Sequence, residues 1–183
     1  MGKKTVSVLI VDDSALMRSL IGKIIEAADG LEVAGKAMNG KFALQKITTL
    51  HPDVIVLDLE MPEMNGIEFL QARKERGIDI PVVILSSLAQ KGAKITMDAL
   101  SLGASDFIMK PSGAVSGDIH TVGTHIVDAL LAYGLNYKKQ HGVVLAEEKV
   151  LPQPQKTETP VVEKVSPKLE QKEKNGLVPL TAP

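Results

Sequence analysis

The sequence contains no cysteine and no tryptophan, and aromatic residues make up only 3% of its 183 positions. Without cysteine, a disulfide scaffold and thiolate-based zinc or redox sites are excluded. Acidic and basic side chains nearly balance, 22 against 21, so no net charge favours nucleic acid or an anionic membrane as a partner. The first apolar run, Val6–Val11, is too short for a signal-peptide core or a membrane span. We therefore expect a soluble, cytoplasmic protein that binds neither nucleic acid nor membranes.

Short β-branched runs alternate with amphipathic helical stretches over residues 4–140. Strands are expected at Val6–Val11, Leu31–Ala37, Val54–Leu57, Val82–Leu85 and Phe107–Met109. Helical spacing of apolar residues follows each strand, first between Ser14 and Asp29, then over about 41–50, 66–76, 93–102 and 118–139. This alternation is typical of α/β proteins. It predicts a doubly wound five-stranded parallel sheet of flavodoxin-like fold with strand order 2-1-3-4-5.

The C-terminal part has a different composition. Residues 143–183 hold six of the ten prolines and are rich in Lys, Glu, Gln and Thr, and their apolar positions show no period. Such a segment buries too little surface to offset its ordering entropy. We predict one folded domain over residues 4–140 and a disordered linker or tail over residues 141–183, with no second folded domain.

Polar residues stand where the apolar runs stop. Asp12 and Asp13 follow the first run and Asp58 the third, while Ser86 and Lys110 follow the fourth and fifth. The carboxyl ends of parallel strands converge on one crevice, where ligands bind. We therefore expect these five side chains to share one pocket.

This set of side chains suits a divalent cation and a phosphoryl group. Mg²⁺ takes oxygen ligands and commonly uses one or two carboxylates. Asp13 and Asp58 are expected to bind it directly and Asp12 through water. Asp58, alone at the end of a central strand and facing open space, is the expected nucleophile toward phosphorus. Ser86 and Lys110 would contact the phosphoryl oxygens.

Each feature also has a simpler structural explanation. The Asp12–Asp13 pair or Ser86 would serve equally well to cap a helix, and Lys110 before Pro111 is typical of an exposed lysine before a turn. The combination of all the features, each in order at a strand end, favours a common site over separate structural roles.

Four segments, VLIVDDSALMR, DVIVLDLEMPEMNGIEFL, VVILSSLAQKG and ALSLGASDFIMKP, resemble the receiver domain of two-component response regulators. Within that family they look most like the receiver half of the chemotaxis protein-glutamate methylesterase. The resemblance implies Asp58 as phosphoacceptor and Asp12 and Asp13 as the metal pair for Mg²⁺. It also implies the main-chain carbonyl of Glu60 as a further metal ligand.

The resemblance further implies a switch. A histidine kinase donates the phosphoryl group to Asp58, Ser86 is the switch hydroxyl, and Lys110 is the phosphate-contacting cation. Phe107 matches the aromatic switch position, and Pro111 matches the family's cis-proline. One departure from the subgroup is Asn65, where Asp is usual before Gly66; since Asn also caps helices, no role is put in doubt.

Several functions stay open at this point. No G-x-S-x-G motif occurs, so this chain is expected not to be an enzyme but a methylesterase regulatory half lacking its esterase domain. The linker would then join it to an esterase domain or a receptor-linked partner. Alternatives are a standalone receiver acting as phosphate sink or adaptor and, less favoured, a haloacid-dehalogenase-type phosphatase. His141, after the last predicted helix, is expected to be solvated.

Overall fold

The computed structural model describes residues 5–87, 92–110 and 116–148. A five-stranded parallel sheet runs in the order β2-β1-β3-β4-β5, as predicted. Its strands are β1 Val6–Val11, β2 Leu31–Ala37, β3 Val54–Leu57, β4 Val82–Ser86 and β5 Asp106–Met109. The helices are α1 Ala15–Ala27, α2 Gly40–Leu50, α3 Gly66–Glu75, α4 Gly92–Ser101 and α5 Ser116–Glu148. The predicted α/β fold class is confirmed.

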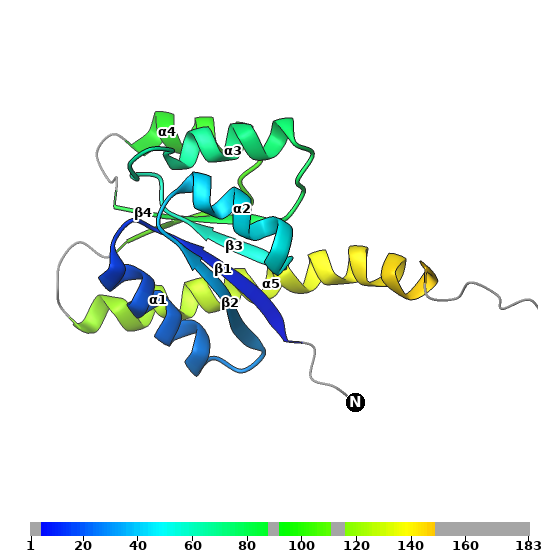
Figure 1. The fold of residues 1–183 in the computed structure, drawn as a ribbon. Helices are drawn as coiled ribbons and strands as arrows, with labels where there is room; N and C mark the ends of the chain where they lie inside the picture. Colours follow the sequence, from blue (N-terminus) through cyan, green and yellow to red (C-terminus); the bar gives the residue numbers. More distant parts are fainter. Residues whose placement is uncertain (1–4, 88–91, 111–115, 149–183) are drawn as a thin grey trace, which may run out of the picture. The chain divides into compact units, whose positions relative to one another are not determined.

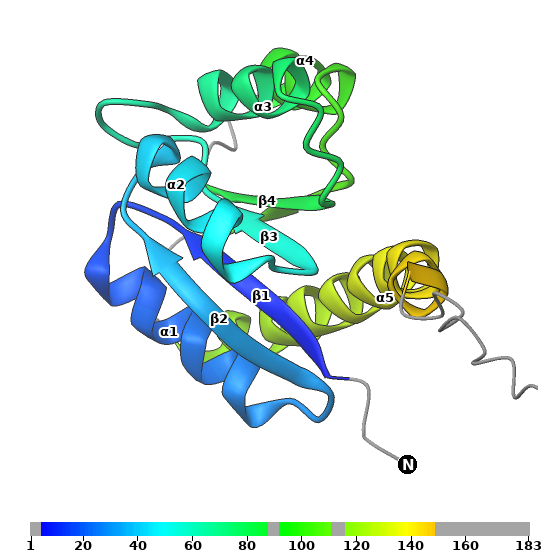
Figure 2. The ribbon, with the colours of Figure 1, turned by 45° about the vertical axis from the view of Figure 1, so that its right-hand side comes forward.

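Helices cover both faces of the sheet. Helices α1 and α5 lie on one face, and α2, α3 and α4 lie on the other (Figures 1 and 2). Alternate residues of β1 serve the two cores: Leu9 packs on the α2–α4 side, and Val8 and Ile10 pack on the α1–α5 side. Burial on both faces explains why the central strands are apolar throughout. None of the helices within the described ranges is long and apolar enough to cross a lipid bilayer.

Side chains at the loop ends start three of the helices. Ser14 caps α1, with its Oγ accepting from the Met17 N–H at 3.3 Å, and Asn39 caps α2. Asn65 caps α3 in a capping box: its Oδ1 accepts from the Glu68 N–H, and the Glu68 carboxylate accepts from the Asn65 N–H. The prediction that Asn65 can serve as a cap is confirmed. These caps fix the loops that follow β1, β2 and β3 on the edge where the strands end.

Helix α5 is longer than predicted. It runs to Glu148 rather than ending near Lys139, so the predicted domain boundary at residue 140 falls inside a helix. The prediction that His141 follows the last helix is therefore wrong, although its side chain is 41% exposed, in agreement with the expected solvation. Its Nε2 lies 2.8 Å from Asp79 Oδ2 and its ring stacks on Tyr137, contacts that join the helix to the loop before β4. The tail over 149–183 and the predicted cis-proline at Pro111 lie outside the described residues.

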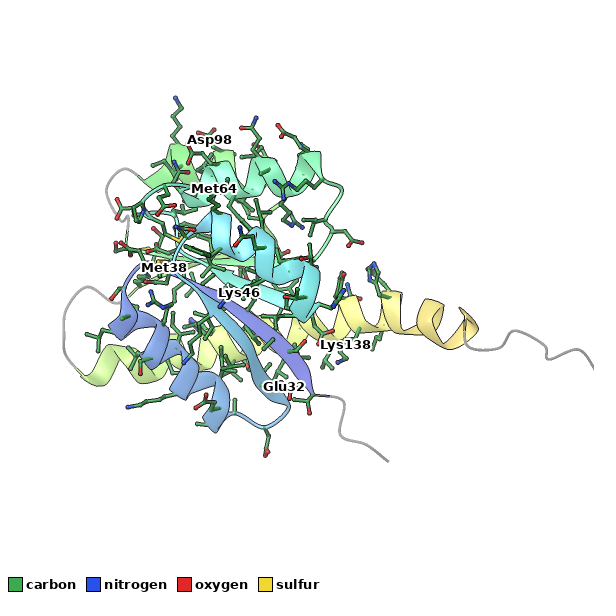
Figure 3. The ribbon with its side chains drawn as sticks, in the orientation of Figure 1. Glu32, Met38, Lys46, Met64, Asp98 and Lys138 are labelled. Atoms are coloured by element: carbon green, nitrogen blue, oxygen red, sulfur yellow. The ribbon has the colours of Figure 1, made fainter. Side chains whose placement is uncertain are left out.

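Polar contacts tie α5 to the edge of the sheet where the strands begin. Lys138 donates to the Thr5 carbonyl at 2.8 Å and to Asp53 Oδ2 at 3.1 Å. Asp53 Oδ2 also accepts from the N–H and the hydroxyl of Ser7, both at 2.8 Å. We call Asp53, Asp79, Tyr137, Lys138 and His141 the amino-end cluster. Figure 3 labels Lys138 there, and Met38, which follows β2, toward the opposite end of the sheet.

Candidate functional site

The predicted site residues are brought to one edge by the sheet itself. Hydrogen bonds of the strand ladder continue one residue past the strands: the Asp12 N–H donates to the Ala37 carbonyl at 3.2 Å and the Asp58 N–H to the Val11 carbonyl at 2.8 Å. The Lys110 N–H donates to the Ser86 carbonyl at 2.9 Å. Each residue therefore has its main chain fixed at the carboxyl end of its strand.

One ammonium lies between two carboxylates at this edge. Lys110 Nζ is 2.7 Å from Asp12 Oδ2 and 2.8 Å from Asp58 Oδ2. The side chains of Lys110, Asp12 and Asp58 are 11%, 2% and 6% exposed. We call these three residues the carboxyl-end cluster. They come from the ends of β5, β1 and β3 and carry two negative charges against one positive.

The pKa values of the cluster reflect this arrangement. Burial raises the pKa of Asp58 above its ordinary value, although its hydrogen bond to Lys110 opposes that effect. Burial alone would lower the pKa of Lys110, but the hydrogen bonds to Asp12 and Asp58 outweigh it and the pKa is raised. Lys110 therefore stays charged, and it balances only one of its two carboxylate neighbours.

The donor set fits a hard cation. Asp12, Asp13 and Asp58 each offer a carboxylate oxygen, and these oxygens lie within 4.8 Å of one another. Asp13 is exposed, whereas the other two are buried. All three donors are oxygens, and the surplus negative charge suits a divalent ion such as Mg²⁺. The Glu60 carbonyl, expected as a further ligand, stays a prediction; the Glu60 N–H makes a long 3.4 Å contact to Asp58 Oδ1.

Asp58 is less open than predicted. It is only 5% exposed, because the Lys110 ammonium lies against one of its oxygens and the main chain packs closely around it. A Cβ atom on Gly66, at the start of α3, would come within 2.5 Å of the Asp58 carbonyl oxygen. An open groove of about 610 Å³ begins beside it, lined by Asp13, Glu60 and apolar residues that include Leu59, Ile67 and Ile95.

The two predicted switch residues lie on neighbouring strands. Ser86 is fully buried at the end of β4, and its Cα pairs with Met109, which precedes Lys110. Phe107 pairs with Ile84 and is partly buried against the core on the α2–α4 side. Their place near the carboxyl-end cluster agrees with the expected roles, which stay predictions.

The sequence reasoning missed Arg18. Its Nη1 atom donates to the carbonyl oxygens of Asp12 at 2.7 Å and Asp13 at 2.9 Å. The available signal was an arginine one helical turn after the Ser14 cap, where its side chain points back toward the preceding turn. An arginine on an amphipathic helix is so common on exposed faces that this signal is weak.

Comparison with known proteins shows which family this chain is similar to. The sequence profile of the response regulator receiver domain matches residues 8–117. The chain belongs to this family. The protein-glutamate methylesterase/protein-glutamine glutaminase of Treponema denticola is 63% identical over 137 residues, which are 75% of this chain and 37% of that protein. The Treponema pallidum protein of the same description is 61% identical over 133 residues, 73% of this chain and 33% of that protein.

A solved structure agrees with the sequence matches. The response regulator domain of Thermotoga maritima CheB has 39% sequence identity and a TM-score of 0.65, covering 71% of this chain and 96% of that chain. The chain therefore holds a receiver domain of the CheB type, from two-component chemotaxis signalling. It spans only about a third of the length of the curated relatives that it matches.

Proposed function

We propose that Asp58 accepts a phosphoryl group from a histidine kinase and that this charge change switches a partner surface of the receiver domain. The observation that carries the proposal is the convergence of Asp12, Asp13, Asp58 and Lys110 from three strand ends. A surplus of carboxylates around one ammonium suits a site that takes up a cation and a phosphoryl group.

In the proposed reaction an Asp58 carboxylate oxygen attacks phosphorus in line with the leaving group. The new oxygen–phosphorus bond forms as the phosphorus–nitrogen bond of the kinase phosphohistidine breaks, and the imidazole nitrogen keeps that electron pair and takes a proton from solvent. Lys110, held charged by its neighbours, stabilises the phosphoryl oxygens. Asp13 and Asp58 would hold Mg²⁺ directly, Asp12 through water, and the Glu60 carbonyl would complete the protein ligands. Bound Mg²⁺ supplies positive charge that offsets the carboxylates and the phosphoryl group.

The switch follows from the added charge. Phosphorylation replaces the single negative charge of the Asp58 carboxylate with a phosphoryl group of about −1.5 to −2 charges and three acceptor oxygens in a buried site. Ser86 would hydrogen-bond the new group, and Phe107 would pack inward into the space left, which remodels the surface of α4, β5 and α5. Near-complete inversion of an inactive/active equilibrium needs about 5.5 kcal/mol. A charge change of this size in a buried pocket is of the right order.

The similarity to methylesterases favours the regulatory half of such a protein over the two alternatives. In that setting the chain would control an esterase domain or a receptor-linked partner through the segment after α5. A standalone receiver that acts as a phosphate sink or adaptor would use the same chemistry at Asp58. A haloacid-dehalogenase-type phosphatase is disfavoured because the family match is to receivers. The cytoplasmic location stays a prediction.

The direct test is incubation of the chain with acetyl phosphate and Mg²⁺, followed by intact-mass measurement. We expect one phosphate adduct that is lost in alkali, as acyl phosphates are, and none after Asp58→Asn or with excess EDTA. Asp79→Asn, which removes a carboxylate at the other end of the sheet, is the matched control and should keep the adduct. A stable adduct in Asp58→Asn, or a yield that is indifferent to EDTA, would contradict the proposal.

A further inference from the structure

The turn between β1 and α1 is held on two sides. On one side each oxygen of the Asp12 carboxylate accepts one hydrogen bond: Oδ1 from the Ser14 N–H at 2.8 Å and Oδ2 from Lys110 at 2.7 Å. On the other side a single nitrogen of Arg18, Nη1, bridges the carbonyl oxygens of Asp12 and Asp13. The main chain that carries both acids is thus clamped by a residue that is not itself an acid or a cation ligand.

The contacts of Arg18 leave the carboxylates free. Among the described residues, Arg18 donates at this turn to main-chain oxygens and not to the carboxylate of Asp12 or Asp13. Hydrogen bonds from a guanidinium are charge-assisted and stronger than those between neutral groups. Arg18 therefore brings a permanent positive charge beside the acids, while their carboxylate oxygens stay available to Lys110 and to a cation.

Asp13 depends on this clamp more than Asp12 does. The Asp12 side chain is fixed by its own two hydrogen bonds, whereas the Asp13 side chain is exposed. The direction of an exposed carboxylate depends on its χ1 rotamer and on its main chain, which fixes the Cα–Cβ direction and restricts the rotamers. The Asp13 carbonyl is held by Arg18 at 2.9 Å, and that contact fixes the peptide plane from which the side chain projects.

We propose that Arg18 is the positioning residue of the cation site: by bridging the Asp12 and Asp13 carbonyls it holds the Asp13 carboxylate toward Asp12 and Asp58. This inference rests on the proposed function, because it assigns Arg18 a role toward the cation which that function requires. Arg18 touches no reacting atom. It acts through the geometry of the turn, because its own positive charge repels a cation.

The test compares three variants by isothermal calorimetry of Mg²⁺ binding. Arg18→Gln removes both the charge and the charged bridge, Arg18→Lys keeps the charge with a single nitrogen, and Lys23→Gln removes an exposed charge from the same helix. Loss of groups that orient metal ligands typically costs 10–100-fold in affinity. We expect about a 10-fold weaker Mg²⁺ affinity in Arg18→Gln, an intermediate value in Arg18→Lys, and less than about a 2-fold change in Lys23→Gln.

Two further measurements separate positioning from general stability. In metal-free protein, amide hydrogen exchange at residues 13–17 should be several-fold faster in Arg18→Gln, while exchange in β3 and β4 stays as in the wild type. In the acetyl phosphate reaction, saturating Mg²⁺ should restore most of the wild-type rate to Arg18→Gln. A variant that merely unfolds more easily would also be rescued by Mg²⁺, because a ligand of the folded state stabilises that state, but it would show faster exchange throughout the sheet. The exchange pattern therefore separates the two cases.

The outcomes distinguish this inference from the proposed function. If the wild type neither binds Mg²⁺ nor takes up phosphate, the proposed function fails, and the inference fails with it. If the wild type does both, and Arg18→Gln binds Mg²⁺ as tightly as Lys23→Gln does, the inference alone is overturned. Should Arg18→Gln not fold, Arg18→Lys decides the matter. Weaker Mg²⁺ binding with faster exchange confined to residues 13–17 in Arg18→Lys supports the clamp. Wild-type affinity, or faster exchange across the whole sheet, overturns it.

Discussion

The two ends of the sheet carry ion pairs that differ in burial and in balance. At the carboxyl-end cluster, Asp12 and Asp58 share one ammonium, and all three side chains are nearly buried. At the amino-end cluster each carboxylate has a partner of its own and the side chains are more open: Lys138 and Asp53 are 34% and 14% exposed, and His141 and Asp79 are 41% and 65% exposed. Contacts of this kind join α5 to the neighbouring loops. At the carboxyl-end cluster, two carboxylates around one ammonium make a buried site that a further charge can change.

This difference also sets the energies. Exposed ion pairs contribute about 0–1 kcal/mol, because solvent screens them. Removing one partner of a buried pair costs about 3–5 kcal/mol, because the other charge is left without compensation. The comparison therefore predicts large and metal-dependent effects at the carboxyl end and small, salt-dependent effects at the amino end.

The largest effect is expected from Lys110→Met. Without the ammonium, Asp12 and Asp58 stand buried as like charges, and we expect the free energy of unfolding at pH 7 to fall by about 3 kcal/mol without metal. Mg²⁺ should restore more stability to this variant than it adds to the wild type. The matched control, Lys138→Met, should lose less than about 1 kcal/mol. Urea denaturation with EDTA or with Mg²⁺ measures both, and equal losses would remove the distinction between the two ends.

Helix α5 runs past both ends of the sheet, and substitutions at two of its glycines test how it packs there. A Cβ atom on Gly134 would overlap the Val6 side chain of β1, whereas on Gly123 the nearest atoms are those of Ile24 at 3.7 Å, an ordinary contact. Gly134→Ala should therefore destabilise the fold by about 2 kcal/mol. Gly123→Ala should stabilise it by about 0.5–1 kcal/mol, the usual gain of alanine over glycine in a helix. Thermal unfolding of the two variants is the measurement, and the same sign for both would show that α5 does not pack on β1 as described.

A change of opposite sign is expected from Asp58→Asn in metal-free protein. Because the pKa of Asp58 is raised by burial, the folded state holds this proton more tightly than the unfolded chain does. The resulting stability is present below the ordinary value of 3.8 and is lost as the pH rises through the higher folded pKa. At pH 7 the variant should be more stable than the wild type, by a difference that shrinks as the pH falls. A pH series of urea midpoints with EDTA checks this, and a wild type that is more stable than the variant at pH 7 would contradict it.

The smallest effect is expected from Asp79→Asn at the amino-end cluster. It removes the charge that faces His141 and Tyr137, yet the side chains of Asp79 and His141 are well exposed, so stability should fall by less than about 1 kcal/mol and less in high salt. Burial, followed by the Asp79 charge, raises the pKa of Tyr137 to about 12. Stability linked to this tyrosine is present below pH 10 and is lost as the pH rises through about 12.

Ultraviolet titration of the two tyrosines measures the pKa of Tyr137 directly. In Asp79→Asn the pKa of Tyr137 should move down toward its ordinary value, and hydrogen exchange at residues 137–148 should quicken while the sheet stays protected. An unchanged tyrosine titration would mean that Asp79 does not face Tyr137 in solution.

The carboxyl-end cluster could be predicted from sequence because a parallel sheet obeys a simple rule. Apolar runs mark the strands, and the residue after each run lies at the common edge, so Asp12, Asp58 and Lys110 were identified by position alone. What this rule does not contain is side-chain packing. The near-burial of Asp58 depends on where the Lys110 ammonium lies, which no periodicity encodes.

The end of α5 and the role of Arg18 could not be predicted for a related reason. A helix end is decided by tertiary contacts such as that of His141 with Asp79, which are far apart in sequence. The composition of the residues after 140 predicts a disordered tail and gives no sign of the last turns of α5. Arg18 acts on main-chain carbonyls, which every residue possesses, so its partners leave no mark in the sequence.

The length of helix α5 determines where it leaves the sheet. Its 33 residues give a rod of about 50 Å that begins beside the edge where the strands end and passes the amino-end cluster before Glu148. Ile126 and Leu130 are buried against the sheet, and Tyr137, Lys138 and His141 fix the helix farther along. The helix therefore ends on the side of the sheet opposite Asp58, so a signal from that residue has to cross the domain to reach the segment that follows.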